Sequence, residues 1–159
     1  MRIGIGFDIH PLVYGRDCVL GGVTLEYGKG PRGHSDGDAL CHAVIDAALG
    51  AAALGDIGHH FPDSDPAYEN IRSIELLEKT AKILGNAGYR VVNIDATLML
   101  EQPNVGGEKR TMAATMAKAL GVPAYQVNVK AKSYNGIGEI GRSEAVAAQA
   151  IAVVEEAEI

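Results

Sequence analysis

The sequence lacks the features that mark secreted, membrane and nucleic-acid-binding proteins. Two cysteines among 159 residues, Cys18 and Cys41, provide no disulfide framework, which fits a reducing compartment. No apolar run reaches the roughly 20 residues of a membrane-spanning helix, and no signal-peptide pattern opens the sequence. A formal net charge of −6 argues against the basic surface of a general nucleic-acid binder. We therefore expect a cytoplasmic protein with neither nucleic-acid nor membrane partners.

The composition is that of an ordinary folded domain. Hydrophobic residues make up 47% of the chain and charged residues 21%, and there is no internal repeat or low-complexity linker. These values predict a single domain over residues 1–159. Because the chain is acidic, an anionic substrate would need a metal cation or a few placed basic groups to offset the protein's own field.

The hydrophobic patterning predicts four strands interleaved with helices. The expected strands lie at 3–9, at 18–28 as a short strand or hairpin with a glycine break, at 90–100 and at 126–133. The expected helices run from about 37 to 54, from near 73 to 85 or 88, near 107–120, and from about 143 onward. The segment 55–66 is predicted to be loop. The predicted fold class is α/β (α+β), with a mixed four-stranded sheet and helices on one side of it. Because nothing in the chain is expected to cover the other face of the sheet, we expect the protein to self-associate.

The segment "FDIH" places an acid and a histidine on one face of the first strand. Apolar residues occupy the odd positions from 3 to 9, whereas Gly4, Gly6, Asp8 and His10 occupy the even ones. The glycines are expected to leave space in front of the sheet, and Pro11 is expected to end the strand. A carboxylate beside an imidazole is a ligand pair that zinc accepts. The alternative is a hydrogen-bonded acid–histidine pair at a strand end.

A third candidate ligand lies in "GHSDGDALCHAVIDAALG". On a helix Asp38, His42 and Asp46 share one stripe, while Cys41 points about 100° away into the core. His42 can present one ring nitrogen to a metal and direct the other toward Asp46; the alternative is a solvated polar stripe. A site of Asp8, His10 and His42 leaves one zinc position open, which is the catalytic arrangement.

Other polar segments are suited to phosphate. His34 and Ser35 precede a helix start, where backbone N–H groups favour an anion. The loops at 55–58 and 61–66 offer acids and exposed backbone, although ordinary surface turns have the same composition. His59 and His60 are expected to face solvent.

The motifs "GIGFDIHPL", "GHSDGDALCHAVIDAALGAAALGDIG" and "FPDSDPAY" closely resemble the 2-C-methyl-D-erythritol 2,4-cyclodiphosphate synthase family. The resemblance covers essentially the whole chain and is densest in the first 80 residues. It implies a phosphorus–oxygen lyase of the non-mevalonate isoprenoid pathway. In this reaction, the 2-phosphate of a CDP-linked methylerythritol attacks its own β-phosphorus and expels CMP. The family is a homotrimer with active sites between subunits.

The resemblance also implies roles for individual residues. Asp8, His10 and His42 would hold one Zn²⁺ per subunit, and Mg²⁺ or Mn²⁺ would accompany the substrate diphosphate. His34 and Ser133 would take part in catalysis. The implied substrate-binding residues are Asp8, His10, His34, Ser35, Asp56, Ile57, Gly58, Phe61, Pro62, Asp63, Ser64, Asp65, Leu100, Gln102, Pro103, Lys132, Ser133, Asn135, Glu139 and Arg142.

The second half departs from the family pattern. Lys132 and Ser133 stand where the family has threonines, Asn135 replaces a glutamate that helps to hold the second metal, and Glu139 replaces a phenylalanine. The 103–110 loop also differs, which bears on base preference. These departures leave two alternatives open. One is a divergent relative acting on another nucleotide-linked diphosphate, and the other is a non-catalytic, zinc-containing trimer that binds a metabolite. A closed structural zinc site is disfavoured, because the ligand set is one short.

Overall fold

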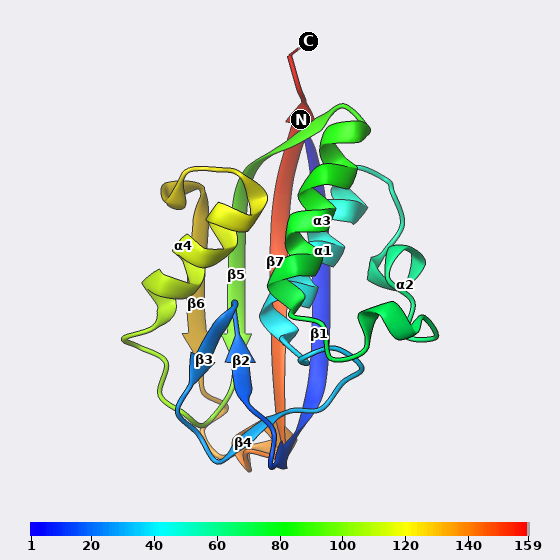
Figure 1. Cartoon of the computed structure of the whole chain (residues 1–159). Coiled ribbons are helices and arrows are strands. Elements are labelled where there is room, and N and C mark those ends of the chain that lie inside the picture. Colours follow the sequence, from blue (N-terminus) through cyan, green and yellow to red (C-terminus); the bar gives the residue numbers. More distant parts are fainter. Residues whose placement is uncertain (159) are drawn as a thin grey trace.

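The computed structural model describes residues 1–158 and consists of a mixed sheet with helices on one face (Figure 1). Five strands, rather than the expected four, form the main sheet in the order β4-β1-β7-β5-β6. The strands are β1 (Arg2–Tyr14), β2 (Cys18–Leu20), β3 (Val23–Leu25), β4 (Lys29–Pro31), β5 (Tyr89–Met99), β6 (Val127–Lys132) and β7 (Ala145–Glu156). Only β5 and β6 pair in parallel within this sheet, and β2 and β3 form a separate hairpin.

The helices agree with the sequence prediction for the first three long segments. They are α1 (Ala39–Ala51), α2 (Ile57–His60), α3 (Ser73–Asn86), α4 (Lys109–Leu120) and α5 (Gly138–Gly141), with 3-10 turns η1 (Pro66–Tyr68) and η2 (Ala124–Gln126). The prediction that segment 55–66 contains no helix or strand is wrong. The short helix α2 forms there because the Asp56 carboxylate accepts the His59 N–H and caps its first turn. Within residues 1–158 no helix has the length and apolar character needed to cross a membrane.

The C-terminal helix expected from about Ser143 is wrong, because this segment is the central strand β7. Alanine favours helices, but β7 lies between β1 and β5, where ladder hydrogen bonds and packing against α1 override that propensity. Its even-numbered residues from 146 to 154 are almost completely buried, whereas Gln149 and Ile151 are exposed. This period-two pattern is the signature of a strand with one covered face.

The two glycines of β1 do not leave open space, contrary to expectation, because the backbone of α1 occupies it. A Cβ atom on Gly6 would lie 1.9 Å from the Ala43 carbonyl oxygen, and one on Gly4 would lie 2.1 Å from that of Ala47. Helix α1 therefore approaches the sheet closely enough to bring His42 beside Asp8 and His10 of β1. Pro11 does not end the strand either: it pairs with Ala145, and β1 continues to Tyr14 alongside β4.

The close approach of α1 predicts a large loss of stability for Gly6→Ala. The added methyl group would overlap helix backbone, which cannot rotate away as a side chain can, so we expect a loss of about 3 kcal/mol or more. Gly50→Ala is the matched control, since Gly50 is exposed on α1 and an added Cβ meets nothing within 4 Å. The free energy of unfolding of this control should rise by about 0.5–1 kcal/mol, because alanine favours a helix more than glycine does. Urea unfolding at one protein concentration measures both, and equal stability of Gly6→Ala and the unmodified chain would contradict the packing argument.

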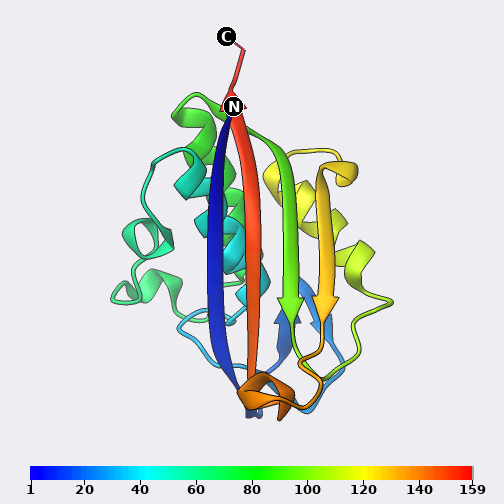
Figure 2. The ribbon, with the colours of Figure 1, turned by 180° about the vertical axis from the view of Figure 1, so that it is seen from behind.

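The sheet face opposite α1, α3 and α4 is apolar, and among the described residues only the short helix α5 covers part of it, at its lower end (Figure 2). Its exposed side chains include Ile3, Ile5, Phe7 and Ile9, which are 73%, 64%, 54% and 50% exposed. Ile151 of β7 pairs in register with Ile5 and is 45% exposed. A contiguous apolar surface of this kind is typical of a protein interface.

Candidate metal centre and its pocket

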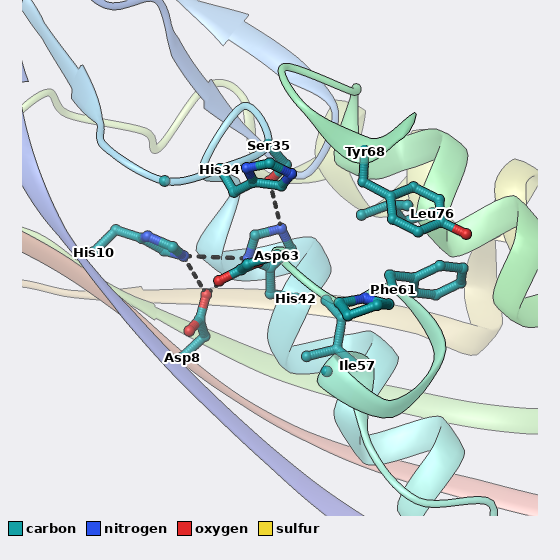
Figure 3. Close-up of a pocket in the computed structure, with 13 residues that line it drawn as sticks. Asp8, His10, His34, Ser35, His42, Ile57, Phe61, Asp63, Tyr68 and Leu76 are labelled. Atoms are coloured by element: carbon teal, nitrogen blue, oxygen red, sulfur yellow. Dashed lines mark hydrogen bonds and ion pairs between the residues drawn. The ribbon is translucent and has the colours of Figure 1, made fainter. Parts of the chain in front are cut away.

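Three predicted ligands converge where the middle of β1 meets the first turn of α1 (Figure 3). Asp8 Oδ2 lies 2.6 Å from His10 Nε2 and 2.9 Å from His42 Nδ1, and the two ring nitrogens are 3.2 Å apart. The register of β1 puts Asp8 and His10 on the face toward α1, and the packing of Gly6 against the helix sets the depth of His42. A carboxylate and two imidazoles that share one small volume are a donor set that fits a divalent metal ion.

The ionisation states of Asp8 and the two histidines depend on one another. Burial by itself raises the pKa of Asp8, but hydrogen bonds with His10 and His42 outweigh it and lower the pKa to about 2. Burial lowers the pKa of His10, whereas its contact with the Asp8 carboxylate raises it by more, so the net shift is upward. Asp8 is therefore held as a carboxylate, the form that ligates metals.

The orientation of His10 is fixed from the side away from the cluster. Its Nδ1 lies 2.9 Å from the backbone carbonyl of Arg32, which can only accept a hydrogen bond. A His10 ring that donates its Nδ1 proton to this carbonyl can present the lone pair of Nε2 to a metal ion held with Asp8 and His42. This is the tautomer that a metal ligand requires.

The predicted partner of His42 is wrong. Asp46 instead accepts the Ile57 N–H at 2.7 Å and thereby ties α2 to α1, and its burial raises its pKa. The Nε2 atom of His42 lies 2.8 Å from Ser73 Oγ and 3.1 Å from Ser35 Oγ. The alternative of a solvated stripe is excluded as well, because His42 is 8% exposed and Asp38 is fully buried. The Asp38 carboxylate caps α1 and accepts N–H groups of the β2–β3 hairpin.

A pocket of about 350 Å³ opens beside the three ligands (Figure 3). It is lined by ten of the residues predicted for metal or substrate: Asp8, His10, His34, Ser35, His42, Ile57, Gly58, Phe61, Pro62 and Asp63. Three others do not line it. Asp56 caps α2, Asp65 caps η1 and accepts from His34 Nε2 through its carbonyl at 3.1 Å, and Ser64 is exposed.

Sequence reasoning missed three residues of the pocket wall, namely Gly33, Tyr68 and Leu76. The Tyr68 ring packs edge-on against Phe61 at 5.4 Å between centroids and so supports the wall formed by the 57–63 segment. Tyr68 stands within the quoted motif "FPDSDPAY", which was a usable signal, whereas Leu76 looks like any apolar helix position.

The remaining predicted residues lie elsewhere on the chain. A second pocket of about 330 Å³, at the ends of β5 and β6, is lined by Leu100, Gln102, Pro103, Lys132 and Ser133 among others, and shares no lining residue with the first. Asn135 is exposed and its Oδ1 lies 3.5 Å from Ser133 Oγ. Glu139 and Arg142 are exposed near α5, where Arg142 pairs with Glu144 at 3.0 Å. One chain alone thus does not bring all the predicted site residues together.

The α+β fold and the open three-ligand cluster beside a pocket with both polar and apolar lining are the features expected of a metal-dependent enzyme. The model of the YgbB family matches residues 1–155, and the chain belongs to this family. The 2-C-methyl-D-erythritol 2,4-cyclodiphosphate synthase of Desulfatibacillum aliphaticivorans is 54% identical and covers 98% of this chain and 100% of its own. The family resemblance seen in the sequence is thereby confirmed.

Solved structures agree with the sequence comparison. The bifunctional IspDF from Campylobacter jejuni superposes with a TM-score of 0.93 at 36% identity, over 98% of this chain and 42% of that one. A CDP complex of IspF from Plasmodium falciparum superposes with a TM-score of 0.85 at 26% identity, over 99% of this chain and 97% of that one.

Proposed function

We propose that the chain converts 4-(cytidine 5'-diphospho)-2-C-methyl-D-erythritol 2-phosphate into 2-C-methyl-D-erythritol 2,4-cyclodiphosphate and CMP. The observation that carries the proposal is the convergence of Asp8, His10 and His42 beside a pocket that contains His34 and Ser35, in a chain of this family. The names of the curated relatives, and the CDP held by one solved relative, support the substrate class.

The reaction is a phosphoryl transfer within one molecule. An oxygen of the 2-phosphate forms a bond to the β-phosphorus while the bond from that phosphorus to the bridging oxygen breaks, and the bridging oxygen leaves with CMP. No water is consumed, so the enzyme belongs to the phosphorus–oxygen lyases. Catalysis then depends on folding the substrate so that both phosphates meet, and on neutralising their charge.

The ligand set supports zinc as the resident ion, held by Asp8, His10 and His42. When bound, zinc supplies a Lewis acid that polarises a phosphoryl oxygen. The chain's own part is to fix the three donors, with Arg32 setting the tautomer of His10. His34 and Ser35 contact the 2-phosphate, and the methylerythritol is held by the residues of the 57–63 segment that line the pocket, namely Ile57, Gly58, Phe61, Pro62 and Asp63. Mg²⁺ or Mn²⁺ accompanies the diphosphate, and the neutral Asn135 makes its binding weaker than a carboxylate would.

The active unit is a homotrimer with its active sites between copies. The support is the apolar sheet face together with the separation of the two pockets, because the strand order places β7 between β1 and β5. Leu100, Gln102, Pro103, Lys132 and Ser133 of one copy then hold the cytidine and phosphates at the Asp8 pocket of the next. Free, buried Cys18 and Cys41 suit a reducing cytoplasm.

The test is to incubate the purified, zinc-loaded protein with the CDP-linked substrate while Mg²⁺ is titrated. We expect CMP and a cyclic diphosphate in equal amounts, identified by chromatography and by ³¹P NMR. Turnover of other nucleotide-linked diphosphates but not of this one would instead support a divergent activity. Binding without turnover of any of them would support a metabolite-binding protein.

A further inference from the structure

Behind the candidate metal centre lies a buried chain of polar groups that runs away from the pocket. It joins three segments: His42 on α1, Ser73 at the start of α3 and Asp36 in the loop before α1. His42 Nε2 lies 2.8 Å from Ser73 Oγ, and the Ser73 hydroxyl in turn contacts Asp36 Oδ1. Ser73 is 0% exposed, so water does not compete for these contacts.

The direction of each hydrogen bond follows from what each group can do. The Asp36 carboxylate can only accept, and it receives the Ser73 hydroxyl proton as well as the backbone N–H groups of Ser73 and Asp38, at 3.0 and 3.1 Å. Because the Ser73 hydroxyl donates its proton to the hydrogen bond with Asp36, Ser73 Oγ can only accept a hydrogen bond from His42. A His42 ring whose single proton is on Nε2 satisfies Ser73 and leaves the lone pair of Nδ1, the atom beside Asp8 and His10, for a metal ion.

Ser35 also contacts His42 Nε2, but it does not determine which ring nitrogen carries the proton. Its Oγ is 3.1 Å from His42 Nε2 and 3.3 Å from Ser73 Oγ, and it accepts the Gly37 N–H. Because Ser35 has no carboxylate partner, its hydroxyl is free to donate or to accept. Only the Ser73–Asp36 pair imposes a single orientation on the ring.

We propose that Ser73, oriented by Asp36, is a positioning residue that locks His42 in the tautomer and ring orientation needed to hold a divalent metal ion through Nδ1. The inference rests on the metal site of the proposed function. It adds that Ser73 of α3 holds the metal ligand His42 in place from behind. Such supports behind a metal-bound histidine typically contribute about 10- to 100-fold to metal affinity.

The test compares metal affinities of the full-length chain and two variants. Ser73→Ala removes the hydroxyl without adding bulk, and Thr80→Val removes another fully buried α3 hydroxyl, which donates only to the Leu76 carbonyl. Co²⁺ is titrated and followed by its visible absorption, and Zn²⁺ is then measured by competition. We expect a Kd about 10- to 100-fold higher for Ser73→Ala and unchanged for Thr80→Val.

A spectroscopic readout separates orientation from general destabilisation. In the zinc-loaded, unmodified protein, the His42 Nε2–H should give a downfield proton resonance protected from exchange with water, and Ser73→Ala should lose that protection. Equal Kd values for Ser73→Ala and the unmodified chain would overturn the positioning role while leaving the metal site intact. An equal loss of affinity in both variants would reduce Ser73 to a structural role and also overturn it. If the unmodified chain bound neither Co²⁺ nor Zn²⁺, both this proposal and the metal site on which it depends would be wrong.

Discussion

Replacing His42 by alanine should abolish stoichiometric zinc binding and lower the rate of CMP release by about a thousandfold or more. The substitution removes one of three converging donors, and Asp8 with His10 alone form only a two-ligand site. The bound metal is expected to supply several kcal/mol of transition-state stabilisation, and each 1.36 kcal/mol corresponds to tenfold in rate. Metal content after dialysis and CMP release under saturating substrate measure the two effects.

His59→Ala is the control for the loss of an imidazole. His59 lies on α2, is exposed and does not line the pocket, and its backbone N–H stays bonded to Asp56. This variant should keep zinc and full activity. If His42→Ala retained zinc and turned over substrate normally while the fold was intact by circular dichroism, the assignment of the metal centre would be wrong.

A charge placed at the centre of the open sheet face should dissociate the assembly. Ile5 is 64% exposed in the single chain, so Ile5→Asp costs the isolated fold little. In a trimer the same carboxylate would be buried without a partner in each copy, at a cost of several kcal/mol per site. We expect analytical ultracentrifugation to show three copies of 16.6 kDa for the unmodified chain and one for Ile5→Asp. Activity should be lost as well, since the proposed site draws residues from two copies.

Tyr125→Asp introduces the same charge at a residue that is 85% exposed on η2, away from the apolar face. It should remain trimeric and active. A fully active monomer of the unmodified chain would contradict the shared site, and a trimeric Ile5→Asp would place the interface elsewhere.

The three candidate donors could be named from the sequence because each depends on a local periodicity. Alternation along β1 puts Asp8 and His10 on one face, and the register of α1 turns Cys41 into the core and His42 away from it. The structure adds the depth of His42, which is set by the contact of α1 with Gly6.

The parts that were missed depend on contacts distant in sequence. The alanine-rich segment of β7 has a helical composition, and only its place between β1 and β5 makes it a strand. Ser73 has the position of a helix start, yet its hydroxyl oxygen lies 2.8 Å from Nε2 of His42, 31 residues earlier. Asp46 has the spacing of a partner for His42, but the Ile57 N–H occupies it instead. Tertiary packing decides such pairings, and sequence spacing alone does not contain that information.

The origin of the attacking oxygen tests the central claim most directly. The reaction is run in water enriched in ¹⁸O, and the products are analysed by mass spectrometry and ³¹P NMR. Closure by the substrate's own phosphate predicts that neither CMP nor the cyclic diphosphate gains ¹⁸O. Incorporation of ¹⁸O into CMP or into an open-chain methylerythritol 2,4-bisphosphate would show that water is the nucleophile, and the chain would then be a hydrolase rather than a cyclising lyase.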